Sequence, residues 1–356
     1  MITPNAHMHP VYDANEKNAV TDYLNSGGWI MEHTKTRELE KMICDYTGAK
    51  FAHMVPSATM GLLLCSMLSN IKHNERFDCP AYTQAATANG AMLLGGKPRF
   101  VDVDPTTFTL NFNHIRNRVV FITSINGRTP AHYEHKIKML QDDGHFVIED
   151  AAQALGSWHR DRHVGTIGHV GVFSFGAPKI ITTGQGGCIV TNDIGLSERI
   201  HAIKNFGRTV GVGEVYNVMG MNFKFTDLQA AFGIEQMKKL PEIIERKKHI
   251  YDFYRNKLKD VCDFVPTDLN KVTPTYPEIL VNDRDKLAKH LGNFGYGTRA
   301  VYSNLGAQPY LRNRTIPWAP NTDYIAARGL QIPSANDLLD YDMNELCTVI
   351  KEHYKL

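Results

Sequence analysis

The stretch that decides the fold is VGVFSFGAPKIITTGQGGCIVTND, residues 170–193. It contains two short apolar runs, at 170–175 and 187–193, that we interpret as buried strands. Between them stands Lys179, next to small residues, threonines and glycines. A lysine is costly to bury and a glycine is costly to order. The segment is therefore either a glycine-rich turn with a solvated lysine or a site where the lysine has a chemical role.

On either side of this stretch, strand-like and helix-like patterns alternate from about residue 13 to residue 240. Further strands are predicted at 51–55, at the start of 75–96, and at 97–104, 119–125 and 145–150, and a helix is predicted at 135–144. The first two strands are each followed by a turn and a helix. Strands that alternate with helices imply a mainly parallel sheet covered on both faces. With the two strands around Lys179, the sequence predicts an α/β protein with a seven-stranded sheet.

The pattern changes after about residue 226. A long helix is predicted over 225–260, with Thr226 as its N-cap and Pro241 as a kink or break. Strands near 276–281 and 297–302 and a helix at 343–356 follow it. We therefore predict a large α/β domain over residues 13–240 and a smaller α+β domain over 241–356, with residues 1–12 packing on the small domain or at the substrate pocket.

Composition and charge exclude several classes of protein. The formal net charge is only +2, so nothing points to a nucleic-acid or anionic-membrane partner. The basic residues Arg160, Arg162 and His163 form a short stretch interrupted by Asp161, which predicts a solvated turn. The N-terminus has no apolar run of the signal-peptide type, and no window is long enough for a membrane helix. We expect a cytoplasmic protein with no membrane partner.

The six cysteines are dispersed, with no CxxC pair and no spacing typical of metal ligands. Reduced, mostly buried thiols are the expected state. No metal site is predicted.

Three candidate groups stand at predicted strand ends, where open α/β sheets bind ligands. Ser57 and Thr59 follow the strand at 51–55 and precede a helix, which suits either a bound phosphate or simple N-capping. Asp150 ends the strand at 145–150, either as a satisfied core carboxylate or as a metal ligand, and no second carboxylate or histidine follows at ligand spacing. Lys179 follows the strand at 170–175.

These three groups together suit pyridoxal phosphate. The chemistry of this cofactor needs an amine that forms a Schiff base with the aldehyde, an anion beside the pyridine nitrogen, and donors for the phosphate. Ser174, five positions before Lys179, could also reach the phosphate. Glycines beyond the lysine would let the backbone pass close to the cofactor; these are Gly184, Gly186 and Gly187. Neither GxxxxGK[ST] nor GxGxxG occurs in the required place, so P-loop and dinucleotide sites are disfavoured.

Four segments carry a family resemblance: residues 51–64, 80–104, 147–193 and 220–233. They resemble the sugar-nucleotide aminotransferases, the DegT/StrS group of pyridoxal-phosphate enzymes that makes amino-deoxy sugars. The resemblance covers most of residues 20–235 in the same order. It implies fold type I, with a large cofactor-binding domain, a smaller C-terminal domain, and a homodimer with shared active sites.

The resemblance also implies roles for individual residues. Lys179 would form the Schiff base and carry the proton, Asp150 would pair with the pyridine nitrogen, and Gln153 would contact the ring face or the phenolic oxygen. The phosphate would be held by Ser57, Ala58, Thr59 and Ser174, together with Asn222 from the partner subunit. The substrate would meet Gly28, Trp29, Lys224, Arg299 and Tyr302.

Three positions depart from the family pattern. Ala58 replaces the usual glycine of the phosphate turn. Gln84 stands where an aromatic residue commonly stacks on the cofactor, and we favour Gln84 over Tyr82 as the replacement cover. Lys224 replaces the usual arginine, which keeps the charge and loses bidentate geometry. Lys179 is retained where the related dehydratases have histidine, and this favours transamination.

The sequence thus predicts transfer of an amino group from L-glutamate to C4 of a nucleotide-linked 4-keto-6-deoxyhexose. The product would be a 4-amino-4,6-dideoxy sugar of the viosamine or perosamine type, with pyridoxamine phosphate carrying the amine between the two half-reactions. A 3-keto sugar nucleotide or an inosose remains open as the acceptor, as does a non-catalytic regulator or pseudoenzyme built on the same fold. UDP, dTDP and GDP all remain open as the nucleotide.

Overall fold

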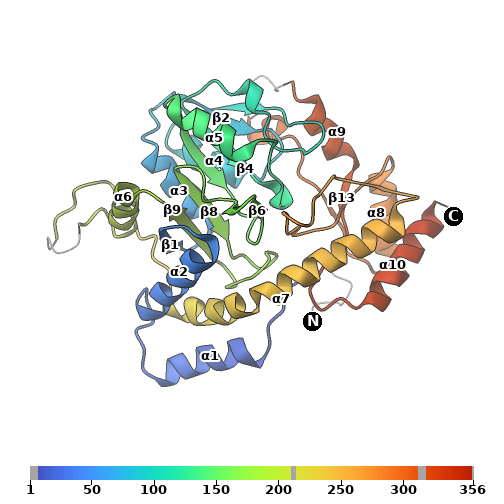
Figure 1. Ribbon diagram of the computed structural model, residues 1–356, viewed down its shortest axis with the longest axis horizontal. Coiled ribbons are helices and arrows are strands. Elements are labelled where there is room, and N and C mark those ends of the chain that lie inside the picture. Colours follow the sequence, from blue (N-terminus) through green and yellow to red (C-terminus); the bar gives the residue numbers. More distant parts are fainter. Residues whose placement is uncertain (1–6, 210–213, 312–317, 355–356) are drawn as a thin grey trace.

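The computed structural model describes residues 7–209, 214–311 and 318–354, and its centre is a seven-stranded sheet (Figure 1). The strands are β1 (Phe51–Val55), β2 (Arg76–Pro80), β3 (Lys97–Val101), β4 (Val119–Thr123), β5 (Phe146–Asp150), β8 (Val170–Ser174) and β9 (Gly187–Thr191). Their order across the sheet is β1-β9-β8-β5-β4-β2-β3. All pairs from β8 to β3 are parallel, and β9 is antiparallel to both of its neighbours. The predicted mainly parallel, seven-stranded sheet is confirmed.

Helices cover both faces of this sheet because its strands are apolar on both sides. The helices of the chain are α1 (Ala14–Asn25), α2 (Thr34–Thr47), α3 (Ala58–Leu68), α4 (Ala86–Leu93), α5 (Tyr133–Asp142), α6 (Ile194–Lys204), α7 (Asp227–Leu258), α8 (Arg284–Asn293), α9 (Pro320–Arg328) and α10 (Asp340–His353). Buried side chains of α2, α5 and α7 pack on one face, and those of α3, α4 and α6 pack on the other. Because helices cover both faces, a ligand can reach the sheet at the carboxyl ends of its strands.

The longest helix, α7, joins the two parts of the molecule (Figure 1). Thr226 is its N-cap, as predicted, and its Oγ1 accepts a hydrogen bond from Gln229 N at 3.3 Å. The helix continues through Pro241, so a break at this position is wrong. Leu240 and Ile244, on either side of the proline, are buried in the core beneath the sheet. This packing holds the helix together although the proline lacks an N–H group.

A second, antiparallel sheet lies beyond the middle of α7. Its strands, in spatial order, are β10 (Asp263–Phe264), β11 (Glu278–Leu280), β13 (Gly329–Gln331) and β12 (Arg299–Ala300). It shares a hydrophobic core with α8, α10 and the second half of α7, which includes Ile250, Leu287 and Leu346. The predicted boundary at residue 240 falls inside α7, and the division into two domains stays a prediction.

The N-terminal segment runs along the molecule and contacts its C-terminal part. Figure 1 shows α1 lying beside α7, and buried Glu16 of α1 forms an ion pair with Lys239 at 2.7 Å. Further upstream, His7 O accepts a hydrogen bond from Ser334 N at 3.1 Å. Within the predicted segment 1–12, residues 1–6 lie outside the described residues.

The predicted solvated turn is confirmed at Arg160 and Asp161, which are exposed between β6 (Trp158–His159) and β7 (Arg162–His163). The expectation is wrong for His163, which is completely buried in this hairpin. The ring of His163 packs 5.3 Å from Phe173 of β8, and its Nε2 accepts a hydrogen bond from Gly156 N at 2.9 Å. Burial lowers the pKa of His163 to about 4, so the ring is neutral and has a structural role.

The cysteines agree with their predicted state, since all six are free thiols and Cys44 is the one that is not fully buried. Across the described ranges, no helix is both long and apolar enough to span a membrane.

Candidate active site

A cavity of about 220 Å³ opens at the carboxyl ends of the central strands. Residues from the ends of β4, β5 and β8 form its floor, and residues from the second sheet form part of its wall. It brings together nine of the residues that the sequence singled out: Ala58, Thr59, Gln84, Asp150, Gln153, Ser174, Lys179, Arg299 and Tyr302.

Asp150, the last residue of β5, is a buried carboxylate with 5% of its surface exposed. Its Oδ2 accepts a hydrogen bond from Thr87 Oγ1 at 2.6 Å, and its Oδ1 accepts one from Ala152 N at 3.2 Å. Burial raises the pKa of Asp150, while these hydrogen bonds and the charge of Lys179 oppose the shift. No basic side chain of the described residues is close enough for an ion pair with it. Asp150 is therefore available to a cationic group of a ligand.

Lys179 follows β8 and lies in a tight turn in which its N–H donates to Gly176 O at 3.1 Å. Its side chain lines the cavity. Burial lowers the pKa of Lys179 to about 8; the charge of Asp150 opposes this shift, and the charge of Arg299 adds to it. Compared with an ordinary lysine, the neutral amine at pH 7 is enriched by roughly two orders of magnitude. The neutral amine is the nucleophilic form.

The start of α3 lies at one end of the cavity, which Ala58 and Thr59 line. Ser57 is the N-cap, and its Oγ accepts a hydrogen bond from the amide three residues further on at 3.2 Å. Ala58 and Thr59 are the first two residues of the helix. Their N–H groups have no intrahelical acceptor, and the helix dipole favours an anion there. A Cβ at Gly187 of β9 would lie 2.5 Å from Ala58 N. Only glycine therefore allows β9 and the start of α3 to approach this closely.

The donor set of the cavity fits pyridoxal phosphate. A reactive amine, a buried carboxylate without a cationic partner and a helix N-terminus for the phosphate all line one space, with Ser174 at the end of β8 beside them. When bound, pyridoxal phosphate supplies an aldehyde that takes up an amine and a conjugated ring that accepts electrons when a substrate C–H bond breaks. Within the described ranges, no group of three or more His, Cys, Asp and Glu residues could hold a metal ion.

The sequence analysis missed three buried threonines at the site: Thr83 and Thr123 line the cavity, and Thr87 lies behind its lining. Thr83 Oγ1 lies 2.8 Å from Thr87 Oγ1 and 3.2 Å from Thr123 Oγ1. The chain of hydroxyls ends on Asp150 through Thr87. Thr83 precedes α4 and Thr87 lies in its first turn, so their contact does not follow a helical spacing. Their link to Asp150 joins different elements, so the sequence pattern did not contain it.

The position of Gln84 differs from that of Tyr82. Gln84 lines the cavity with an exposed side chain, and its Oε1 accepts a hydrogen bond from Ala86 N. Tyr82 is completely buried and packs edge-on against Tyr302, with ring centroids 6.2 Å apart. Of these two candidates for covering the cofactor, Gln84 is the one that a cavity ligand can meet.

The wall contributed by the second sheet carries the predicted substrate residues Arg299 and Tyr302. Gln153 Nε2 donates to Tyr302 Oη at 2.9 Å, and the Arg299 guanidinium lies 5.7 Å from the centroid of the Tyr302 ring. Arg299 is exposed and makes no ion pair within the described part of the chain. It is therefore an available cation at the mouth of the cavity.

Five of the predicted site residues do not line this cavity: Ser57, Gly28, Trp29, Asn222 and Lys224. Ser57 lies directly beside it as the N-cap of α3. The other four belong to two segments that lie side by side, since Met31 and Thr226 pair in an isolated β-bridge. Trp29 is 62% exposed and Asn222 is also exposed. These segments form a separate surface of the same chain.

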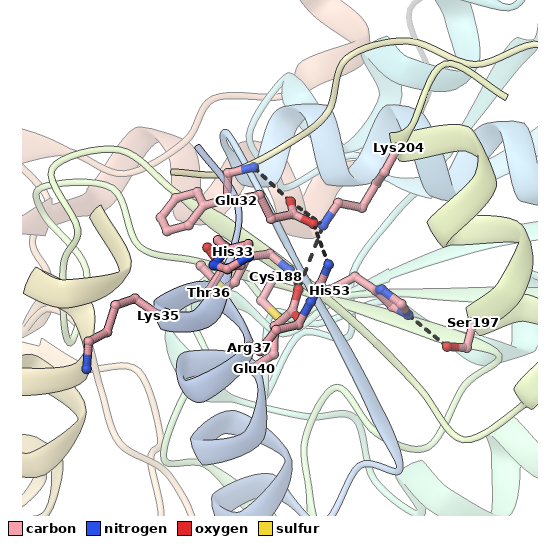
Figure 2. Close-up of polar contacts among 12 residues, drawn as sticks. Glu32, His33, Lys35, Thr36, Arg37, Glu40, His53, Cys188, Ser197 and Lys204 are labelled. Carbon is pink, nitrogen blue, oxygen red and sulfur yellow. Dashed lines mark hydrogen bonds and ion pairs between the residues drawn. The ribbon is translucent and has the colours of Figure 1, made fainter. Parts of the chain in front are cut away.

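A buried ion cluster holds these two segments in place (Figure 2). Lys204, at the end of α6, is 3% exposed, and its Nζ lies 3.0 Å from Glu32 Oε2 and 3.8 Å from Glu40 Oε1. Glu32 Oε2 also accepts a hydrogen bond from Phe225 N at 3.1 Å. The buried carboxylate of Asp227 accepts three amide hydrogen bonds from the start of α2, at 2.8–2.9 Å. The surface that carries Trp29, Asn222 and Lys224 is thus rigidly built.

Fold and cavity together define a pyridoxal-phosphate enzyme of fold type I. The model of the DegT/DnrJ/EryC1/StrS aminotransferase family matches residues 10–351, and the chain belongs to this family. It is a pyridoxal-phosphate-dependent sugar aminotransferase, as the sequence predicts.

Individual relatives match over nearly their whole length. The chain is 30% identical to protein MJ1066 of Methanocaldococcus jannaschii, with 96% of each chain covered. It is 27% identical to the GDP-perosamine synthase of Escherichia coli O157:H7, with 97% of this chain and 98% of the relative covered. Among solved structures, the aminotransferase TlmJ of Streptoalloteichus hindustanus superposes with a TM-score of 0.92 at 24% identity, with 99% of each chain covered. The structural similarity to TlmJ supports the assignment of the fold.

Proposed function

We propose that the protein transfers an amino group from L-glutamate to C4 of a nucleotide-linked 4-keto-6-deoxyhexose, giving a 4-amino-4,6-dideoxy sugar for glycan biosynthesis. The observation that carries this proposal is the meeting of Lys179 and Asp150 in one cavity of a sugar aminotransferase. The near full-length similarity to a GDP-perosamine synthase favours the perosamine type of product and, among the three nucleotides, GDP.

Lys179 is the proton carrier in this proposal. With its pKa lowered to about 8, Nζ can both accept and return a proton near neutral pH. In the first half-reaction it would remove the proton from Cα of the amino acid, and in the second it would deliver a proton to the sugar carbon. Because Lys179 lines the cavity, one amine can serve both substrates in turn.

Asp150 and Arg299 would act by charge. Asp150 would keep a negative charge beside the ring nitrogen of the cofactor, held in orientation by the hydrogen bond from Thr87. Arg299 is exposed at the cavity mouth and makes no ion pair with any described residue, and it would bind the diphosphate of the sugar nucleotide. Gln153 would contact the ring, with its amide oriented by Tyr302.

A homodimer with shared sites would give the remaining residues a role. Trp29 and Asn222 do not line the cavity of their own chain, and exposed apolar side chains surround them. These side chains include Ile30, Met31, Val218, Met219 and Met221, of which Met219 is 84% exposed. Apolar exposure of this kind is typical of an interaction surface. We propose that it places Asn222 at the partner's phosphate, and Gly28, Trp29 and Lys224 at the partner's substrate.

The reaction is tested with purified protein, pyridoxal phosphate, L-glutamate and a set of keto sugars, by following formation of the amino sugar. Wild-type protein should aminate a GDP-linked 4-keto-6-deoxyhexose, and Lys179→Ala should not. Turnover by the Lys179→Ala variant would contradict the role of the lysine. Amination of a 3-keto sugar nucleotide or an inosose in place of the 4-keto sugar would contradict the proposed acceptor.

Shared sites are tested by mixing subunits. Lys179→Ala and Asn222→Ala each damage both sites of a dimer, but in a mixed dimer both substitutions fall in one site and the other is intact. Co-expressed variants should therefore regain activity that neither variant has alone. If mixed dimers form and no activity returns, Asn222 does not act across the interface.

A further inference from the structure

Tyr276 lines the cavity, although it lies just before β11 and far from the motifs that define the site. It is 2% exposed, and its Oη donates a hydrogen bond to Pro178 O at 2.9 Å. Pro178 directly precedes Lys179. The phenol of Tyr276 thus binds the backbone that carries the reactive amine.

The backbone of Tyr276 is itself held by Asn126. Asn126 Nδ2 donates to Tyr276 O at 2.7 Å, and Tyr276 N donates to Asn126 Oδ1 at 2.9 Å. Asn126 is completely buried and has a φ of +52°, a left-handed conformation that asparagine tolerates better than most residues. Its own N–H donates to Gln153 Oε1 at 2.9 Å. One buried asparagine therefore connects Tyr276 with another wall of the cavity.

The ring of Tyr276 is supported from its other side by the N-terminal segment. The rings of His7 and Tyr276 stack with centroids 5.1 Å apart and an interplanar angle of 25°. His7 O accepts a hydrogen bond from Ser334 N at 3.1 Å, and Ser334 O accepts one from buried Lys247 Nζ at 2.6 Å. His7 is thereby tied to α7 and to the segment after β13.

Residues 176–179 form a tight turn, here called the Pro178–Lys179 corner. Gly176 and Ala177 have no side chain that could form a hydrogen bond, so the corner depends on contacts from other segments. Within the corner, Lys179 N donates to Gly176 O at 3.1 Å, and Gly176 N lies 3.4 Å from Ser174 Oγ. Both contacts lie within the connection between β8 and β9. Among the described residues, Tyr276 is the one outside this connection that forms a hydrogen bond with residues 176–179.

We propose that Tyr276 is a positioning residue that fixes the Pro178–Lys179 corner, and that Asn126 and His7 hold Tyr276 in place for this role. The inference rests on the proposed role of Lys179. The physical reason is that misplacing a reactive group by about 1 Å can lower its rate by roughly 100-fold. The hydrogen bond limits movement of the corner, and the stacked rings limit movement of the phenol.

The test measures how fast pyridoxal phosphate attaches covalently to the apoprotein, followed by the absorbance change. Tyr276→Phe keeps the ring and loses the hydrogen bond, so attachment should slow about three- to tenfold. His7→Ala should slow it less, and His7→Phe, which keeps a stacked ring, should restore the wild-type rate. Tyr251→Phe is the matched control, since the buried Tyr251 Oη also donates to a backbone carbonyl, Val265 O at 2.8 Å, away from the cavity. It should attach the cofactor at the wild-type rate.

The outcomes separate this inference from the proposed function. If wild-type protein attaches the cofactor through Lys179 and Tyr276→Phe does so at the same rate, the positioning role is wrong and the function stands. Equal slowing by Tyr251→Phe would also overturn it, because the effect would then be one of general stability. If wild-type and Lys179→Ala proteins both fail to attach the cofactor, the proposed function fails and the inference fails with it.

Discussion

Two of the regions that bury charged side chains, the cavity and the cluster of Figure 2, do so in opposite ways. In the cavity, Asp150 and Lys179 have no ion-pair partner among the described residues, and burial shifts the pKa of each toward its neutral form. In the cluster of Figure 2, Lys204 lies between Glu32 and Glu40. There burial would raise the pKa of Glu32, but Lys204 and a backbone amide lower it below its ordinary value.

The presence or absence of an ion-pair partner distinguishes the candidate active site from the structural ion cluster. A buried charge without a partner destabilises the fold, and a protein keeps such a group when a ligand or reaction uses it. A buried charge with a close partner is satisfied within the chain and holds segments together. The same residue types thus form an active site in one place and a structural clamp in the other.

The largest effect should follow from Lys179→Ala. Loss of the proton carrier and of the attachment point should lower transamination by about 10⁴-fold or more. The free energy of unfolding of the apoprotein, measured with denaturant, should not fall, because an unpaired amine has been removed. A marked loss of stability would show that Lys179 has a structural role. The cavity and the ion cluster would then not differ in the way proposed.

Lys204→Ala should have the opposite profile. It leaves Glu32 and Glu40 with Arg37 as their remaining cation, at 3.1 and 2.8 Å, so the free energy of unfolding should fall by about 1.5–3 kcal/mol. Lys41→Ala is the matched control, since Lys41 and Asp45 form an exposed ion pair at 2.6 Å, and its effect should stay below about 1 kcal/mol. Equal effects of the two substitutions in denaturant unfolding would contradict a structural role for the buried cluster.

Asp150→Asn should lower kcat by about 100-fold while leaving the fold intact. The substitution keeps the size of the side chain and an oxygen that can accept the Thr87 hydrogen bond, but it removes the negative charge. Steady-state kinetics and thermal unfolding measure the two effects. A variant with wild-type kcat would show that the charge of Asp150 is not used.

The smallest effect concerns pH. The neutral amine of Lys179 is needed for attachment, so the rate of pyridoxal phosphate attachment should rise about tenfold per pH unit and level off above about pH 8. Because Asp150 raises the pKa of Lys179 against the effect of burial, Asp150→Asn should move the midpoint to lower pH. A midpoint near 10.5 in wild-type protein would mean that Lys179 behaves as an ordinary solvated lysine.

The sequence alone was sufficient for the class of fold and for the chemical groups of the site. Buried apolar runs alternating with helical patterns predicted the sheet, because a strand covered on both faces must be apolar on both. Lys179, Asp150 and the turn at Ser57 were predicted because each lies at or shortly after the end of a predicted strand, and the ends of parallel strands meet at one edge of the sheet. These are local signals, carried by a few consecutive residues.

Only the tertiary structure decided which residues support those groups and which lie elsewhere. Asn126 and Tyr276 are 150 positions apart, and Thr87 and Asp150 are 63 apart, so no local pattern joins them. Burial of His163 depends in the same way on packing between elements. The structure also separates Trp29 and Asn222 from the cavity of their own chain. Local chemistry determined what the site contains, whereas packing between distant segments decided how its groups are held.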